Sequence, residues 1–157
     1  QPQARLRVLG DGALRGEHER LAQALGVADS LEWLAPTPDV ERHYREAAVF
    51  VLSSRYEGMP LALLEAQALG VPAVAFDCPT GPGEIVTAQT GRLVAPGDVD
   101  ALAAALVELL SSPPLRAQMG QAAIERNRAV FSAREHERRW AALVRDVALK
   151  NAYGVAA

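Results

Sequence analysis

The sequence contains few of the residues that metal sites, disulfide frameworks and nucleic-acid interfaces require. A single cysteine and three scattered histidines give no disulfide pair and no cluster at metal-ligand spacing. Aromatic residues make up 5% of the chain and no basic stripe accompanies the net charge of -3, so nucleic acid is not expected as a partner. No apolar run approaches the roughly 20 residues that span a bilayer. We therefore expect neither a protein-built metal site nor a membrane span.

The composition of the chain is typical of one globular domain. Half of the 157 residues are hydrophobic and 22% are charged, which suffices for a substantial core. The opening segment QPQARLRVLG is too short and too polar for a signal peptide, which favours a cytoplasmic location. Because the chain starts at Gln1 and reaches a strand-like run almost at once, we expect residues 1–157 to be one N-terminally truncated domain of a longer protein.

Short apolar runs alternate with helical patterns along the chain. The runs that predict strands are 6–9, 31–34, 48–52, 73–76 and 92–94. Several of them are apolar throughout, which is typical of strands covered on both faces. The alternation predicts an α/β protein with a doubly wound, Rossmann-like parallel sheet and helices on both faces.

Local signals predict where the helices begin and end. Starts are expected at Thr37 with Pro38 as the first helical residue, at Pro60, at Asp98, near Pro113 and at Ser132, and ends at Gly26 and Gly70. At the last start, Ser132 and Glu135 have the spacing of a capping box. The helix after Asp98 is expected to present the apolar face Val99, Leu102, Leu106, Leu109 and Leu110.

The candidate site lies where a strand leads into a helix. In doubly wound sheets, ligands bind beyond the carboxyl ends of the strands. The loops expected there are 10–12, 35–37, 53–59 and 77–83, which are rich in Gly, Pro and polar residues. Loop 53–59 precedes a helix whose first N–H groups lack partners within the helix. Those donors and the helix dipole suit a phosphate group, and Gly58 lets a ligand approach the backbone closely.

Two glutamates flank this anion site. Glu57 lies in the loop, and Glu65 lies about 7 Å along the helix axis at ~1.5 Å per residue. The spacing fits a ligand with hydroxyl groups at both ends and a diphosphate between them, as in a nucleotide-sugar. For either glutamate alone, a solvated side chain or a simple helix-dipole role is an equal alternative. Their pairing at one strand end makes that alternative less favoured.

The stretch SRYEGMPLALLEAQALGVPAVAFD resembles the Glu-x7-Glu signature of retaining glycosyltransferases of family four, which have the GT-B fold. Four further segments resemble the C-terminal, donor-binding domain of these enzymes: LRVLGDG, LEWLAPTPDVERHYREAAVFVLSSRYEGMP, DCPTGPGEIV and TGRLVAPGDVDALAAAL. The resemblance implies that the full-length parent transfers a sugar from a nucleotide-diphosphate sugar to an acceptor hydroxyl with retention. DCPTGP is most similar to bacterial members that build surface polysaccharides.

The resemblance also implies roles for individual residues. Glu57 would contact the donor sugar and is the candidate catalytic residue, and Glu65 would bind the ribose hydroxyls. The other donor-binding candidates are Gly10, Gly12, Trp33, Leu34, Ala35, Gly58, Met59, Pro60 and Leu61. No cofactor or metal is implied, because GT-B enzymes hold the diphosphate with cationic side chains and a helix N-terminus. The acceptor, a glycan or lipid-linked glycan, would bind an N-terminal domain, and the parent is expected in the cytoplasm, peripherally at the inner face of the membrane.

The sequence departs from this pattern in three ways. It lacks the basic stretch that precedes LRVLGDG in the family, and Gly83 stands where a basic residue usually follows DCPTGP. Weak donor binding and no turnover are therefore expected from this chain alone. The resembled domain has strand order 3-2-1-4-5-6, and its first, central strand is missing here. Strands 6–9 and 48–52 must then pair directly, leave a gap or borrow a strand, and unpaired edges predict self-association.

Other functions fit parts of the sequence. A non-catalytic nucleotide-sugar-binding or interaction domain would keep the fold and the donor pocket without the chemistry. A nucleotide-sugar epimerase shares the GT-B architecture, but the Glu-x7-Glu segment disfavours it. Asp11 and Asp77 end strands as in receiver domains, yet the single lysine, Lys150, lies in the terminal helix. Cys78 lacks a neighbouring histidine and is expected to be a small buried residue.

Overall fold

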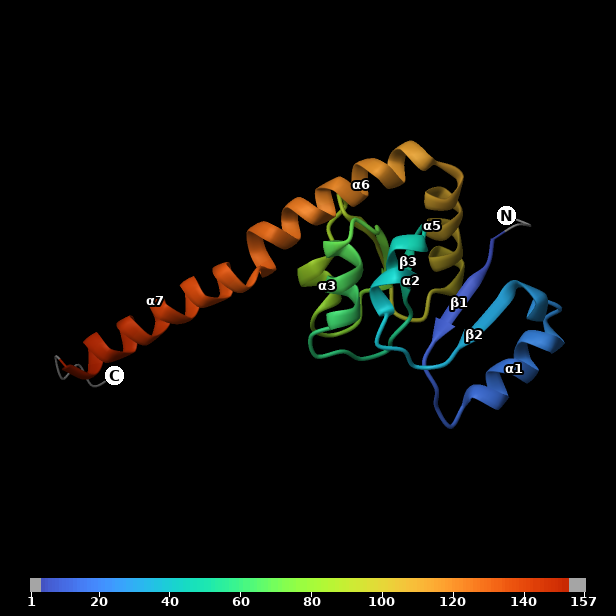
Figure 1. Ribbon diagram of the computed structural model, residues 1–157, viewed down its shortest axis with the longest axis horizontal. Helices are drawn as coiled ribbons and strands as arrows, with labels where there is room; N and C mark the ends of the chain where they lie inside the picture. Colours follow the sequence, from blue (N-terminus) through green and yellow to red (C-terminus); the bar gives the residue numbers. More distant parts are fainter. Residues whose placement is uncertain (1–3, 153–157) are drawn as a thin grey trace.

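The computed structural model describes residues 4–152, without the side chains of 150–152. Its strands are β1 (Leu6–Leu9), β2 (Leu31–Leu34), β3 (Phe50–Leu52), β4 (Ala73–Phe76) and β5 (Gly91–Val94). Its α-helices are α1 (Arg15–Ala24), α2 (Val40–Glu46), α3 (Leu61–Ala68), α4 (Pro82–Ile85), α5 (Val99–Ser111), α6 (Pro113–Arg126) and α7 (Ala133–Ala152). A 3-10 turn, η1 (Ala28–Ser30), precedes β2, and a π-helical turn, η2 (Asn127–Phe131), joins α6 to α7 (Figure 1). The Lys150 side chain lies outside the described residues.

The strands form two parallel sheets, with the order β1-β2 in one and β3-β4-β5 in the other. Within residues 4–152, β1 and β3 do not pair, so the gap is the alternative that the structure adopts. The gap lies where the missing central strand was predicted. Helix α2, which lies between the two sheets in the sequence, contacts the first of them, because Arg7 of β1 donates to Glu46 of α2 at 2.6 Å.

The core lies on both faces of β4, which is buried along its whole length. Neighbouring strand residues point to opposite faces, so Ala73 and Val74 contribute to different clusters. One cluster joins Ala73 to Leu63, Ile85 and Val86, and the other joins Val74 to Ala105, Leu109 and Met119. Helix α3 therefore covers one face and helices α5 and α6 the other. The predicted arrangement of parallel strands with helices on both faces is confirmed, and Cys78 is buried as expected.

The β1-β2 half is far less buried. Three leucines within or next to α1 are open to solvent, since Leu14, Leu21 and Leu25 are 58%, 54% and 66% exposed. Only Ala22 of that helix is buried. The predicted end of α1 is confirmed, since Gly26 has φ +68° and follows the cap residue Leu25. The two-stranded sheet is too narrow to cover this helix.

Two predicted helix starts are wrong by one or two residues. Helix α2 begins at Val40, because the Thr37 hydroxyl accepts from the Asp39 N–H at 3.2 Å and makes a turn instead of a cap. Helix α3 begins at Leu61, because Pro60 has ψ +89° and occupies the cap position. Its predicted end at Gly70 is confirmed by φ +80° there.

Two strands also differ from their predicted bounds. Strand β3 begins at 50 and not at 48, since the chain must turn after α2 before Phe50 can donate to Pro72 at 2.9 Å. Strand β5 begins at 91 and not at 92, because Gly91 pairs with Ala73.

The C-terminal helices follow the local signals closely. Asp98 accepts from Ala101 at 2.9 Å, and α6 begins at Pro113 as predicted. Of the predicted face of α5, Leu109 is fully buried, but Val99 is 67% exposed because it lies at the helix start.

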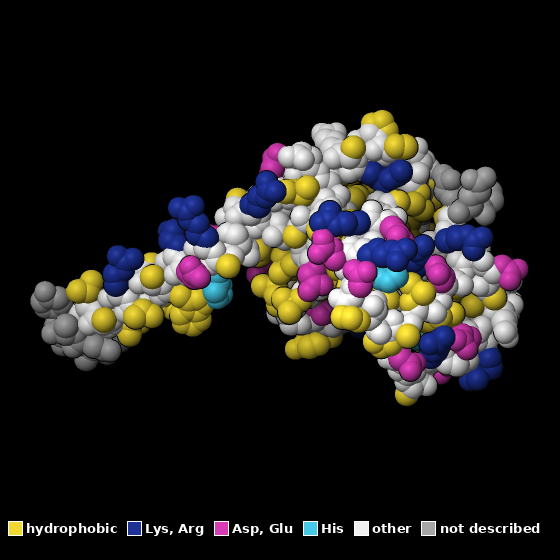
Figure 2. Space-filling view, viewed as in Figure 1, with side chains coloured by type: hydrophobic (Ala, Val, Ile, Leu, Met, Phe, Trp, Pro, Cys, Tyr) yellow, Lys and Arg dark blue, Asp and Glu magenta, His cyan; other side chains and the backbone are white. Residues whose placement is uncertain are grey.

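The capping box of α7 is only half formed. The Ser132 hydroxyl accepts from the Glu135 N–H at 3.3 Å, while the Glu135 carboxylate pairs with Arg138 and Arg139. These arginines hold the pKa of Glu135 down at about 2. Helix α7 projects away from the body, and hydrophobic and basic side chains lie along its surface (Figures 1 and 2).

Candidate functional site

Loop 53–59 leaves the carboxyl end of β3 and presents Glu57. The Ser54 hydroxyl donates to Oε1 of Glu57 at 2.6 Å, which fixes a half-buried carboxylate. Gly58 and Met59 are exposed beside it, and no side chain caps the following helix α3. The loop therefore places a carboxylate next to uncapped backbone N–H groups that favour an anion.

A second loop packs directly against this one. The Thr80 hydroxyl donates to the backbone carbonyl of Glu57. Thr80 has φ +62° and Gly81 has φ +89°, and a Cβ on Gly81 would lie 2.5 Å from Cδ of Pro60 and 2.9 Å from the oxygen of Gly58. Strained backbone of this kind is typical of functional sites. The sequence placed loop 77–83 at this edge but gave no signal for the role of Thr80.

Glu65 lies on the exposed side of α3 and is held from another helix. The Tyr44 hydroxyl of α2 donates to Oε2 of Glu65 at 3.1 Å. Burial, and then the hydrogen bond to Glu65, raise the pKa of Tyr44 to about 12. The sequence offered no signal for this contact, because Tyr44 and Glu65 lie 21 residues apart on different helices.

A cavity of about 240 Å³ lies at the ends of β1 and β2 and is lined in part by Gly10, Gly12 and Trp33. Two residues of α1 that were not predicted also line it and cover the indole. The Arg15 guanidinium lies 5.8 Å from the centre of the Trp33 ring, and the His18 ring stacks on it at 6.4 Å. The cavity thus contains a cation and an aromatic platform.

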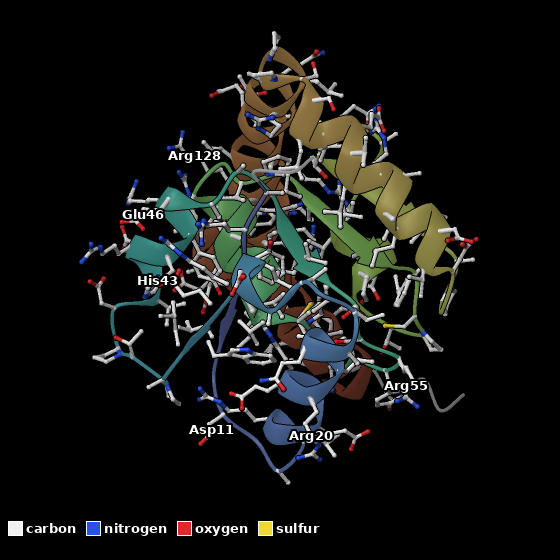
Figure 3. All side chains as sticks on the ribbon, turned by 90° about the vertical axis from the view of Figure 1, so that its right-hand side faces the viewer. Asp11, Arg20, His43, Glu46, Arg55 and Arg128 are labelled. Atoms are coloured by element: carbon white, nitrogen blue, oxygen red, sulfur yellow. The ribbon has the colours of Figure 1, made fainter. Side chains whose placement is uncertain are left out.

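The predicted site residues fall into two groups at one edge of the molecule. Gly10, Gly12 and Trp33 share the cavity, where Leu34 accepts from the Gly10 N–H at 3.0 Å and Ala35 follows on the surface. The other group is Glu57, Gly58, Met59 and Pro60 in the loop after β3, with Leu61 and Glu65 in α3, and none of these lines the cavity. Figure 3 shows Asp11 and Arg55, from the two loops, along the same lower edge.

Two further observations concern residues 4–152. No group of three or more His, Cys, Asp and Glu residues there is arranged to hold a metal ion. None of the helices in that range combines the length and the apolar character that crossing a membrane requires.

Comparisons with known proteins give the same assignment across most of the chain. Residues 1–126 match the family described as "Glycosyl transferases group 1". An exopolysaccharide phosphotransferase of Streptomyces coelicolor is 42% identical over 126 residues, which are 79% of this chain and 13% of that protein. The amylovoran biosynthesis glycosyltransferase AmsD of Erwinia amylovora is 35% identical over 76% of this chain and 34% of its own length.

A solved structure shows the same fold. The HepE protein of Anabaena, crystallised with UDP and glucose, superposes with a TM-score of 0.85 at 20% identity, over 93% of this chain and 41% of that one. The chain therefore spans well under half the length of each of these proteins. The family match covers 126 of the 157 residues, and it includes both groups of candidate site residues. The chain belongs to the group 1 glycosyl transferases.

Proposed function

We propose that this chain is the donor-binding domain of a retaining hexosyltransferase. The complete protein would transfer a hexose from a nucleotide-diphosphate sugar to an acceptor hydroxyl during polysaccharide or glycoconjugate synthesis. The observation that supports this best is the pair Glu57 and Glu65 on either side of the uncapped start of α3, each held by a neighbouring hydroxyl.

The geometry suggests how the donor would bind. Glu65 would accept hydrogen bonds from the ribose, while Gly58 and the N-terminus of α3 would face the diphosphate. Glu57 would meet the sugar, where Thr80 keeps its loop in place. The diphosphate would need no metal ion, because the backbone N–H groups at the start of α3 offer compensating positive charge.

The names of the relatives favour an enzyme over a non-catalytic binding domain. The Erwinia protein is named a glycosyltransferase and is matched over 34% of its length, whereas the Streptomyces protein is named a phosphotransferase and is matched over only 13%. The acceptor glycan or lipid-linked glycan would bind a separate domain. The chain alone is expected to show no turnover, and the complete protein to work in the cytoplasm, peripherally at the inner face of the membrane.

The first test is nucleotide binding to the isolated chain. UDP, GDP and ADP would be titrated to millimolar concentration while backbone amide shifts are followed by NMR. We expect one nucleotide to shift the amides between Gly58 and Glu65. Replacing Glu65 by alanine should remove most of the shifts at these concentrations, because losing a hydrogen bond to a charged group costs about 1.5–3 kcal/mol.

Glu137→Ala is the matched control, since Glu137 is also an exposed glutamate on a helix. It should bind like the wild type. A folded wild-type chain that shows no shifts with any nucleotide would overturn the proposed donor site.

We also propose that the chain self-associates through the edges of β1 and β3. Each of these strands pairs on one side only within the described residues, and Leu6 of β1 is 47% exposed. Unpaired parallel edges bind further strands. Light scattering should give a mass above that of one chain that rises with concentration. Leu6→Lys should lower it, because a charge on an edge opposes pairing; a stable wild-type monomer would contradict this proposal.

A further inference from the structure

A tyrosine from outside the signature segment holds one of its two glutamates. Tyr44 lies on α2 and Glu65 on α3, and their hydroxyl and carboxylate oxygens are 3.1 Å apart. The Tyr44 ring is itself fixed, since it packs edge-on against Phe50 of β3 at 5.9 Å and 65°. Within the described residues, no other hydrogen bond or ion pair is seen at the Glu65 carboxylate. One of its oxygens is therefore held while the other faces solvent.

We propose that Tyr44 is a positioning residue for the donor site. Its hydroxyl fixes the Glu65 carboxylate in one rotamer, so that the second oxygen is ready to accept the hydroxyl groups of the ribose. The inference rests on the proposed function, because it takes Glu65 to be the ribose-binding group.

The chemistry of tyrosine suits this role better than that of a cation. An arginine or lysine would neutralise the carboxylate and compete with the ligand for it. A phenol donates one hydrogen bond and leaves the full negative charge, so the free oxygen remains a strong acceptor. The pKa of Tyr44 is raised to about 12, so the phenol keeps its proton at every physiological pH.

The fixed rotamer matters because ordering a free glutamate side chain costs conformational entropy. An exposed glutamate samples many rotamers, and its freedom is lost when a ligand binds. Where a neighbour has already fixed the side chain, ligand binding does not have to overcome that loss of entropy. Tyr44 thus prepares Glu65 before the nucleotide arrives.

The experiment compares Tyr44→Phe with the wild type, alone and in the Glu65→Ala background. Tyr44→Phe keeps the ring and removes only the hydroxyl, so the melting temperature serves as the check on folding. UDP, or whichever nucleotide the wild type binds best, should bind the single variant on the order of three- to tenfold more weakly. In the Glu65→Ala background, residual binding measured at raised ligand concentration should not change. An equal loss in both backgrounds would show that Tyr44 acts independently of Glu65, and would overturn the proposal.

A second measurement needs no ligand. Three-bond scalar couplings report whether the Glu65 side chain occupies one rotamer or averages over several. We expect one rotamer in the wild type and averaging in Tyr44→Phe. Averaging in both proteins would overturn the positioning role even if nucleotides bind. If no nucleotide binds but the couplings differ as expected, the proposed function is wrong. The result would still show that Tyr44 fixes the rotamer of Glu65.

Discussion

Glu57→Gln in the complete protein is expected to lower the rate of sugar transfer on the order of 10²–10³-fold, the effect of removing one electrostatic stabiliser of a transition state. The substitution keeps the size and shape of the side chain and removes the charge that is proposed to lie beside the reacting sugar. Nucleotide affinity should change much less, because Glu65 and the start of α3 are proposed to bind the other end of the donor. Steady-state kinetics with saturating donor would separate the two effects, since kcat should fall while KM for the donor stays nearly constant.

Ser54→Ala tests the same role of Glu57 and is expected to have a smaller effect. The Ser54 hydroxyl holds Oε1 of Glu57 at 2.6 Å, so its loss frees the carboxylate without removing it. We expect a fall in kcat of about tenfold, the effect of one ordinary hydrogen bond. If Glu57→Gln retained nearly full activity, Glu57 would be a structural residue and the catalytic assignment would be wrong.

Gly120→Ala is expected to destabilise the fold by about 3 kcal/mol, at the upper end of the range for overpacking. Gly120 is buried in α6, and a Cβ there would overlap the carbonyl oxygen of Gly70 at the end of α3. Backbone cannot move aside as a flexible side chain can, so α6 would have to shift away from α3. Urea unfolding followed by circular dichroism would measure the loss as a lower midpoint.

The same substitution at Gly16 is the matched control. Gly16 lies in α1, and a Cβ there would meet only the end of the Arg20 side chain, at 3.6 Å. Alanine is the better helix former, so Gly16→Ala should be neutral or slightly stabilising. Similar midpoints for the two variants would mean that α6 and α3 do not pack closely in solution.

Short-range signals predicted much of the fold. The apolar runs predicted every strand that the described residues contain. Asp98 caps α5, and Gly26 ends α1 with a positive φ, as their chemistry requires. Errors arose where a tertiary contact set a boundary. Thr37 has the right side chain for a cap, but its hydroxyl makes a turn instead. The division of the sheet depended on which strands meet, and periodicity alone left three alternatives open.

The candidate site also combines features that the sequence determines with features that only the fold determines. The sequence by itself determined the chemical groups: two glutamates at a fixed spacing, a glycine between them and the N–H groups of a helix start. Only the tertiary structure decided which groups hold them, because Ser54 is a near neighbour whereas Tyr44 and Thr80 come from other elements. A local pattern records spacing along one chain segment. Contacts between segments depend on how helices and strands pack, and that packing is a property of the whole fold.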